Sequence, residues 1–301
     1  MATVEPTGRI LGATIRGADL SKQLNENERE TIAGALARYG VVCFPQQNLD
    51  ATGLRDFAAQ LGEVQTPEGP KDPDVPEISV LSNIVENGRN IGAVDAGMIW
   101  HKDMTYQKDA GWATMLYGVR IPRRDGRALG ATRFANAAAA YDDLPDAIKG
   151  KLENAVGVHN SIMYNARVRE LGSKRAAYTG DKAKKKKPSR HPLLLIHPVS
   201  GRKVLYCDPG HVESIDGLPG NEGDEMLAFL AEHQLQSKYQ YAHEWTEGDV
   251  LMWDNISTLH CATLDYDAQE PRLMKRCQIV APRGFDVARV RATFLPANAH
   301  A

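Results

Sequence analysis

Four side chains of this 301-residue chain form a set that can hold a metal ion beside an anion. His101 and Asp103 stand two positions apart, His260 lies far downstream, and Arg272 follows His260. Two imidazoles and one carboxylate on one face of a metal leave three coordination positions open, which is typical of non-haem Fe(II) oxygenases. The set therefore predicts an iron centre held by the two histidines and the aspartate, with the arginine nearby to bind an anionic cosubstrate.

The spacing of His101 and Asp103 predicts how one segment supplies two ligands. Side chains two apart on a β-strand project from the same face. A strand over residues 99–105 would direct both side chains to one side. The third ligand, His260, would then come from another strand that the fold brings close.

Other histidines offer alternatives to this ligand set. A second His-x-carboxylate pattern stands at His211-Val212-Glu213, but it follows the turn signal Asp208-Pro209-Gly210. His260 could also be a buried histidine that shares a hydrogen bond with a backbone carbonyl. His233 and His243 fit that structural role better, because neither lies near an arginine pair.

Arg272 and Arg276 are four residues apart on the predicted last core strand and should share one face. Unpaired buried charge is costly, so two guanidinium groups that point inward require anions. The planar guanidinium fork suits a carboxylate, which it binds through two parallel hydrogen bonds. The alternative is a pair of intramolecular salt bridges with nearby acidic residues, namely Asp265, Asp267 and Glu270.

Several segments in the same order resemble the taurine and aryloxyalkanoate dioxygenases, a family of Fe(II)- and 2-oxoglutarate-dependent oxygenases. The resemblance covers most of the chain and closes with His260, Arg272 and Arg276. A bare His-x-Asp pattern is weak evidence, but this ordered set is specific. The matching segments are GATIRGADLS at 12–21, GVVCFP at 40–45, LGE at 61–63, WHKD at 100–103, HPVSGRKVLY at 197–206 and GDVLMWDN at 248–255.

The resemblance implies roles for the individual residues. His101, Asp103 and His260 would bind Fe(II), and Arg272 would grip the distal carboxylate of 2-oxoglutarate. Thr132 matches a threonine that helps hold this carboxylate, although Ala131 stands where the family usually has an acidic residue. With O2, such enzymes release succinate and CO2 and hydroxylate the primary substrate.

The primary substrate implied by the resemblance is a small anion: a carboxylate, an aryloxyalkanoate, a sulfonate or a sulfate ester. Arg276 would meet the substrate's own anionic group. Taurine is disfavoured, because Thr66 and Gly97 stand where taurine enzymes have a histidine and an asparagine. Tyr206 and Met104 would line an apolar or aromatic-tolerant pocket, but each could equally be ordinary core.

Two other functions fit the same residues. One is an iron oxygenase that oxidises its substrate with O2 and uses no 2-oxoglutarate, which would leave Arg272 without a cosubstrate partner. The other is a non-catalytic jelly-roll protein in which the arginines capture an anion and the histidines are structural. The combined ligand and arginine set favours the 2-oxoglutarate-dependent enzyme.

Composition excludes several classes of protein. Hydrophobic residues make up 43% and charged residues 25% of the chain, as in ordinary globular proteins. A net charge of −2 gives no electrostatic case for nucleic acid or an anionic membrane as a partner. The four cysteines contain no C-x-x-C pair, so we expect free thiols. Without a signal-like N-terminus or a long apolar run, a cytoplasmic location is expected.

The elements expected from local patterns are many short strands and a few helices. They predict a mainly β fold with flanking helices, a double-stranded β-helix (jelly roll, cupin-like). We expect one domain over 1–301 with a helix and strand prelude at about 1–65, and relatives suggest a homo-oligomer, a dimer or tetramer. Helices are expected at 25–39, capped by Asn25 or Asn27 and ended by Gly40, and at 50–61, 135–144 and 224–234; strands are expected at 9–20, 41–44, 78–81 and 111–121.

Residues 182–187 hold five lysines in six positions. Such a run cannot be buried, so it predicts a mobile, solvated loop rather than a patch that binds a partner. By resemblance, this stretch lies in a basic lid loop at about 160–190.

Overall fold

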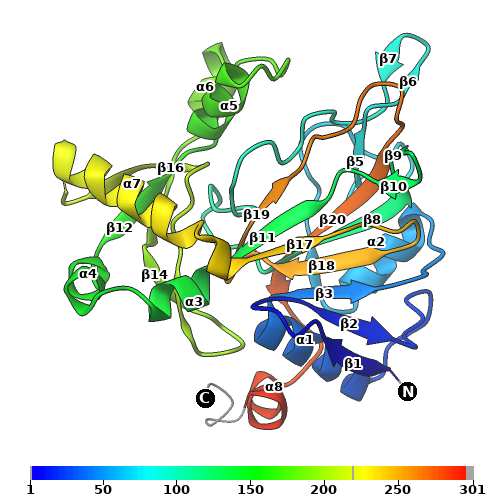
Figure 1. The fold of residues 1–301 in the computed structure, drawn as a ribbon, viewed down its shortest axis with the longest axis horizontal. Coiled ribbons are helices and arrows are strands. Elements are labelled where there is room, and N and C mark those ends of the chain that lie inside the picture. The colour runs from blue at the N-terminus through cyan, green and yellow to red at the C-terminus, as the bar shows by residue number, and fades with distance from the viewer. Residues whose placement is uncertain (1, 219, 296–301) are drawn as a thin grey trace.

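The computed structural model describes residues 2–218 and 220–295, and the fold is mainly β with several helices (Figure 1). An eight-stranded sheet forms its centre and pairs strands from both ends of the chain. Its strands run in the order β1 (Thr3–Pro6), β2 (Ala13–Arg16), β3 (Val41–Phe44), β18 (Val250–Asp254), β8 (Ala113–Arg120), β20 (Leu273–Pro282) and β4 (Gly62–Val64), with β5 (Ser79–Ser82) also pairing with β20.

A three-stranded sheet packs against this large sheet. It consists of β11 (Thr132–Asn136) between β17 (Gln240–His243) and β19 (Thr258–Ala262). Phe134 on β11 and Trp253 on β18 lie with ring centroids 5.6 Å apart, in a buried cluster that includes side chains of both sheets. The candidate ligands His101 and His260 lie at the edge of this sandwich, where His260 belongs to β19.

Two helices cover the other face of the large sheet, α1 (Glu26–Tyr39) and α2 (Ala51–Ala59), and α8 (Val287–Phe294) packs against α1 (Figure 1). Leu36 of α1 and Phe57 of α2 are fully buried in the same cluster as Phe44 of β3. This cluster is apolar and includes none of the candidate site residues, so the helical side of the sheet is structural.

The chain between β11 and β17 makes a separate layer of helices and short strands (Figure 1). Its helices are α3 (Ala137–Asp142), α4 (Asp146–Leu152), α5 (Ser161–Glu170), α6 (Gly180–Lys185), α7 (Asn221–Gln234) and the 3-10 turn η1 (Ser237–Tyr239). Its strands are β12 (Val156–His159), β13 (Ser189–Pro192), β14 (Leu194–Ile196), β15 (Lys203–Leu205) and β16 (Val212–Asp216); two-residue strands elsewhere are β6 (Val85–Glu86), β7 (Arg89–Asn90), β9 (Arg123–Arg124) and β10 (Arg127–Ala128).

The prediction of a strand over residues 99–105 is wrong. Only His101 pairs with another strand, through an isolated bridge to His260, and the chain then turns over 103–106. The buried ammonium of Lys102 donates to the carbonyls of Ile256 and Thr258 at 2.7 and 3.3 Å, which holds the start of this turn. A turn and not a strand therefore sets the relative placement of His101 and the aspartate that follows it.

The other expected elements largely agree with the structure. The helices at 25–39, 50–61 and 224–234 are confirmed as α1, α2 and α7, and the strands at 41–44 and 111–121 as β3 and β8. The helix expected at 135–144 begins later, at Ala137, because its first residues complete β11. The segment 160–190 was expected to be a loop but contains α5 and α6.

Two expectations from composition can be compared with the structure directly. All four cysteines are free, as predicted. Within the described residues, no helix combines the length and apolarity that a membrane crossing requires.

The N-terminus of α1 yields a stability prediction. Asn25 accepts from the backbone N–H of Glu28, and the Glu28 side chain accepts in return from the Asn25 N–H, which completes a capping box. We expect Asn25→Ala to lower the free energy of unfolding by about 1 kcal/mol. Urea denaturation measures the change. Asn27→Ala is the matched control and should shift stability by less than about 0.5 kcal/mol; equal losses would contradict the assigned cap.

Candidate functional site

The structure brings His101, Asp103 and His260 together into one buried cluster. One potential ligand atom from each lies within 4.8 Å of the others. The Nε2 atoms of His101 and His260 approach the Asp103 carboxylate at 3.7 and 3.8 Å. These separations exceed hydrogen-bond length, and a small cation bound between the three groups would account for them.

Neighbouring groups orient two of the three side chains. The Nδ1 atom of His101 lies 2.8 Å from the carbonyl of Ile99, so an Nδ1–H tautomer donates there and leaves the Nε2 lone pair free. The hydroxyl of Thr114 on β8 donates to Oδ2 of Asp103 at 2.8 Å. Hydrogen bonds of this kind fix ligand orientation in metal sites.

The protonation states at neutral pH match those a metal requires. Burial, assisted by the neighbouring His101, lowers the pKa of His260 to about 3, so its imidazole is neutral. Burial alone would raise the pKa of Asp103, but the adjacent imidazoles and Arg276 outweigh it and hold this pKa well below its usual range. A neutral imidazole and an ionised carboxylate can bind a metal without first losing protons.

Thr132 and Arg272 line a small cavity directly beside these ligands. The same cavity is lined by His101, His260 and Arg276. Thr132 lies at the first position of β11, and its hydroxyl oxygen accepts from the indole N–H of Trp245 at 3.0 Å. Its hydroxyl proton is therefore free to be donated into the cavity.

Arg272 is a buried cation without an anionic partner. Only 4% of the residue is exposed, and burial lowers the pKa of its guanidinium although it stays protonated at neutral pH. The Tyr266 ring lies 5.7 Å from it, and no carboxylate pairs with it anywhere in residues 2–218 and 220–295.

The alternative of internal salt bridges for Arg272 is wrong. Arg124 takes two of the three candidate acids, at 3.1 Å to Asp267 and 2.7 Å to Glu270. The third, Asp265, accepts from the backbone N–H of Gly130. The cavity therefore contains a positive charge that an anionic ligand can neutralise.

Arg276 lies on β20 and lines both the small cavity and a larger one. Its Nη1 atom is 3.7 Å from Oδ1 of Asp103, and its buried Nε atom has no hydrogen-bond partner in the described structure. The predicted shared face of Arg272 and Arg276 is confirmed, because both side chains line the small cavity.

Tyr206 and Met104 do not line either cavity, contrary to the expectation that they contact substrate. Met104 is fully buried and packs against Gly111. Tyr206 is also fully buried, 5.4 Å from the ring of His159 between centroids. Met104 lies in the turn that follows His101, and this turn directs its side chain into the core.

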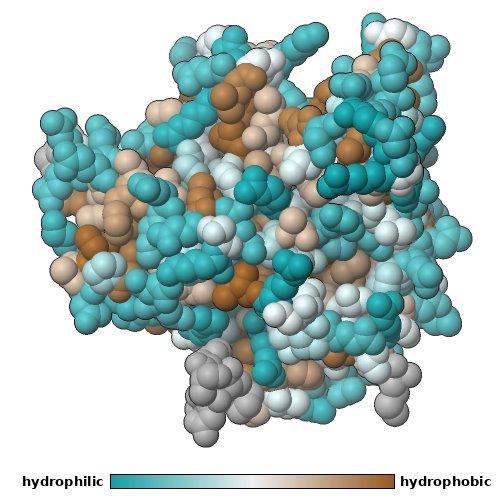
Figure 2. Space-filling view, in the orientation of Figure 1, coloured by the Kyte–Doolittle hydropathy of each residue, from teal (hydrophilic) through white to brown (hydrophobic). Residues whose placement is uncertain are grey.

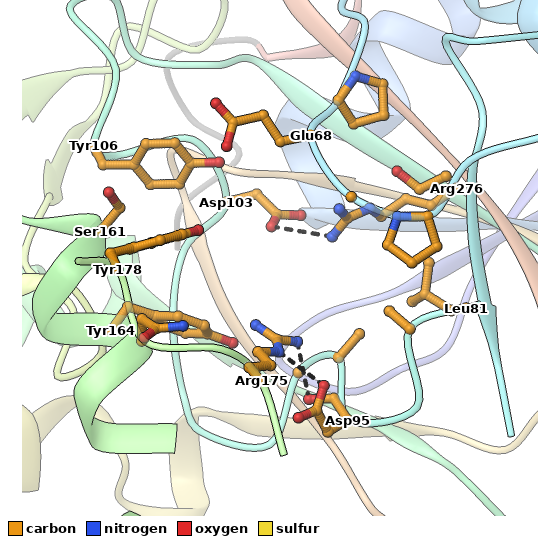
Figure 3. A pocket seen from close by; sticks show the side chains of 18 of the residues that line it. Glu68, Leu81, Asp95, Asp103, Tyr106, Ser161, Tyr164, Arg175, Tyr178 and Arg276 are labelled. Carbon is orange, nitrogen blue, oxygen red and sulfur yellow. Dashed lines mark hydrogen bonds and ion pairs between the residues drawn. The ribbon is translucent and has the colours of Figure 1, made fainter. Parts of the chain in front are cut away.

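The larger cavity has a volume of about 720 Å³ and reaches from the ligand cluster to the segment 161–187. Figure 3 shows Asp103 and Arg276 on one side of it, with Tyr106, Tyr164 and Tyr178 on the opposite wall. Figure 2 shows the molecule notched between the protruding α5–α6 segment and the β6–β7 hairpin, with mostly hydrophilic atoms along the rims. A drug-sized ligand fits a space of this volume.

Most of the residues that line the wall opposite Asp103 and Arg276 were not among those predicted from the sequence. His211 belongs to the rejected His-x-Glu pattern, yet it lines the cavity, stacked on Tyr164 at a centroid distance of 4.6 Å. Asp208 accepts from its ring at 3.2 Å, while Glu213 instead binds Asn160. The turn signal before His211 was the available clue, because that turn places Asp208 behind the ring.

Comparisons with known proteins agree with this geometry. A model of the taurine catabolism dioxygenase TauD, TfdA family matches residues 3–278. The chain is 29% identical over 296 residues to an alpha-ketoglutarate-dependent 2,4-dichlorophenoxyacetate dioxygenase of Burkholderia sp. (strain RASC), covering 92% of this chain and 94% of that protein. It is 30% identical over 305 residues to an alpha-ketoglutarate-dependent sulfate ester dioxygenase of Pseudomonas putida, covering 96% and 94%.

Solved structures show the same fold. A taurine dioxygenase from Burkholderia xenovorans superposes with a TM-score of 0.75 at 29% identity, covering 94% of this chain and 93% of that one. AAD-2, in complex with Mn(II) and N-oxalylglycine, superposes with a TM-score of 0.78 at 26% identity, covering 94% and 98%. The similarity extends over nearly the full length in both cases.

The Thr114–Asp103 hydrogen bond yields a prediction about metal affinity. We expect Thr114→Val, which keeps the shape but removes the donor, to weaken Fe(II) binding at least about 10-fold. Anaerobic competition against a chromogenic chelator measures the dissociation constant. Thr114→Ser retains the hydroxyl and should bind within about 3-fold of the unaltered chain. Unchanged affinity in the valine variant, with an unchanged melting temperature, would refute this role.

Proposed function

Because this chain belongs to the taurine catabolism dioxygenase TauD, TfdA family, we propose that it is an Fe(II)- and 2-oxoglutarate-dependent dioxygenase that hydroxylates a small anionic organic substrate. The observation that carries the proposal is the buried Arg272 beside the His-Asp-His cluster, which pairs with no carboxylate in the part of the chain that the structure describes. That arrangement combines a site for a divalent metal with a site for the carboxylate of a metal-chelating cosubstrate.

His101, Asp103 and His260 would hold the iron. Their donor atoms converge, one histidine is oriented by a backbone carbonyl, and the aspartate is oriented by Thr114. Bound Fe(II), with 2-oxoglutarate and O2, supplies the oxidising chemistry that releases succinate and CO2 and inserts an oxygen atom into the substrate. The carboxylate ligand leaves one net positive charge on the metal unit, which favours an anionic cosubstrate.

Arg272 and Thr132 would hold the distal carboxylate of 2-oxoglutarate. Arg272 offers a planar pair of N–H donors in a nearly dry environment, where a charge-assisted hydrogen bond is strong. The Thr132 hydroxyl can add a third donor, because the indole of Trp245 occupies only its acceptor side. N-oxalylglycine, found in AAD-2, has the skeleton of 2-oxoglutarate with NH in place of one methylene.

Arg276 would bind the anionic group of the primary substrate. It lines the boundary between the two cavities and approaches Asp103 at 3.7 Å, so a substrate bound to it lies next to the metal ligands. Relatives named for 2,4-dichlorophenoxyacetate and for sulfate esters support an aryloxyalkanoate, carboxylate, sulfonate or sulfate ester as substrate.

Several features of the fold enter this proposal. We expect the two packed sheets to form a double-stranded β-helix within one domain over residues 1–301, which includes the helix and strand prelude at about 1–65. The segment at about 160–190 would act as a lid over the larger cavity, which its side chains line. We expect the active form to be a dimer or tetramer.

Coupled turnover tests the proposed function. Incubation with Fe(II), 2-oxoglutarate, O2 and a panel of aryloxyalkanoates, sulfonates and sulfate esters should release succinate in proportion to O2 consumed. An iron oxygenase that uses no 2-oxoglutarate would consume O2 without succinate. A binding protein would neither consume O2 nor release succinate. The His260→Ala variant provides the metal-free control.

The two arginines are expected to act on different ligands. We predict that Arg272→Gln raises the dissociation constant for 2-oxoglutarate about 10- to 100-fold, because it removes hydrogen bonds from a charged group. Arg276→Gln should change it less than about 3-fold. Titration of the anaerobic Fe(II) protein with 2-oxoglutarate, followed through the visible charge-transfer band, gives both constants. Equal losses in the two variants would refute the division between cosubstrate and substrate.

A further inference from the structure

The outer half of the larger cavity is strongly basic, although the chain as a whole carries a net charge of −2. Among the described residues, Glu68 and Asp95 are the only acidic side chains that line it away from the ligand cluster. The cationic residues that line this half all come from one segment: Lys174, Arg175, Lys182, Lys185, Lys186 and Lys187. This segment therefore places a local excess of positive charge at the outer half of the cavity.

Contacts across the cavity hold this segment in place. Lys186 binds Glu68 at 2.6 Å. Arg175 binds Asp95 at 2.8 Å, as Figure 3 shows. Lys182 lies 4.9 Å from the centre of the Tyr178 ring. The lysine run is thus docked along the cavity, whereas its sequence predicted a solvated loop.

These contacts neutralise both acidic groups, but the segment carries more cations than these two acids can pair with. Glu68 and Asp95 are each paired with one cation of the segment. No carboxylate within the described ranges pairs with the remaining cations, which are Lys174, Lys182, Lys185 and Lys187. The mouth of the cavity therefore keeps a local positive charge that a ligand can meet.

Aromatic side chains occupy the wall between the two charged ends. Tyr106, Tyr164 and Tyr178 line the cavity together (Figure 3). Tyr164 stacks on His211 with an interplanar angle of 10°. Flat, rigid walls of this kind favour a planar ligand body.

We propose that the primary substrate is an elongated dianion with a planar body. One anionic group binds Arg276 beside the metal ligands, and a second carboxylate, sulfate or phosphate binds the lysines at the cavity mouth. This inference rests on the proposed function and specifies its substrate class. The cavity volume of about 720 Å³ provides room for a body that joins two anionic groups.

The second anion should contribute modestly and in a salt-dependent way. Lys182, Lys185 and Lys187 are exposed, so each ion pair with the ligand remains hydrated and screened. The lysines also attract a dianion before it enters, which raises the association rate. At low ionic strength we therefore expect a dianion to bind about 10-fold more tightly than an isostere whose second group is neutral.

The test compares matched ligands on the anaerobic Fe(II) and 2-oxoglutarate complex. The probes are phenoxyacetates whose para position carries a carboxylate, a carboxymethyl, a sulfonate or a phosphate. Each is paired with a neutral isostere, in which the para group is uncharged and the acetate carboxylate is kept. Binding is followed by perturbation of the charge-transfer band. We expect at least one dianion to bind about 10-fold more tightly than its isostere, and this advantage to shrink as salt is raised.

Two triple variants locate the effect. Lys182→Gln/Lys185→Gln/Lys187→Gln should abolish the dianion advantage and leave the affinity for the neutral isosteres within about 3-fold. Lys149→Gln/Lys151→Gln/Lys184→Gln removes the same charge from residues that do not line the cavity and should retain the advantage. Retention in the first variant, or equal loss in both, overturns the assigned lysine site.

The remaining outcomes separate this inference from the proposed function. If the isosteres perturb the band and no dianion binds more tightly than its isostere, the dianion proposal is overturned while the dioxygenase assignment stands. If Fe(II) and 2-oxoglutarate give no band at all, the proposed function fails, and the substrate inference fails with it.

Discussion

The site depends on one pair of backbone hydrogen bonds. The N–H of His101 donates to the carbonyl of His260 at 3.0 Å, and the N–H of His260 donates back at 2.8 Å. This isolated bridge joins two segments that are distant in sequence and aligns both imidazoles. Every other feature of the site is arranged around it: the turn that follows His101 delivers Asp103, and the strand pairing of β19 with β11 brings Thr132 to the same cavity.

Charge explains why we propose this arrangement as a binding site and not as a part of the structural core. A guanidinium that is nearly dry and lacks a carboxylate partner destabilises the unliganded protein unless an anion binds. Arg272 is such a group, because Arg124 binds the acids that stand closest to it in sequence. Arg276 approaches Asp103 only at 3.7 Å, so both arginines remain available to ligands. Two cationic side chains therefore lie beside the three side chains that we propose as metal ligands.

Much of the site could be predicted from the sequence because its residue types are specific to their chemistry. The candidate site is recognisable from residue type and order: the pattern around His101, the distant His260 and the arginine pair. The capped helix α1 can be predicted from local sequence rules. The placement of Met104 and Tyr206 could not be predicted in this way. Met104 depends on a turn with a φ of 62° that is held by the buried Lys102, and Tyr206 depends on how the inserted layer packs.

The role of the lysine run was also beyond local patterns. Residue type alone predicts a solvated loop, since five lysines cannot be buried. Its docking along the cavity depends on the long-range ion pair between Lys186 and Glu68, which no local window contains. In the sequence, His211 belonged only to the weaker His-x-Glu pattern. Its side chain lines the cavity because of the tertiary fold.

The central claim is that one cavity joins a metal held by His101, Asp103 and His260 to a carboxylate held by Arg272. A crystal structure of the protein grown with Mn(II) and N-oxalylglycine, with anomalous scattering to locate the metal, tests it most directly. The account predicts a metal between the three side chains and the distal carboxylate of the ligand paired with the Arg272 guanidinium. A metal bound elsewhere, or a ligand carboxylate that engages Arg276 and leaves Arg272 unpaired, would contradict it.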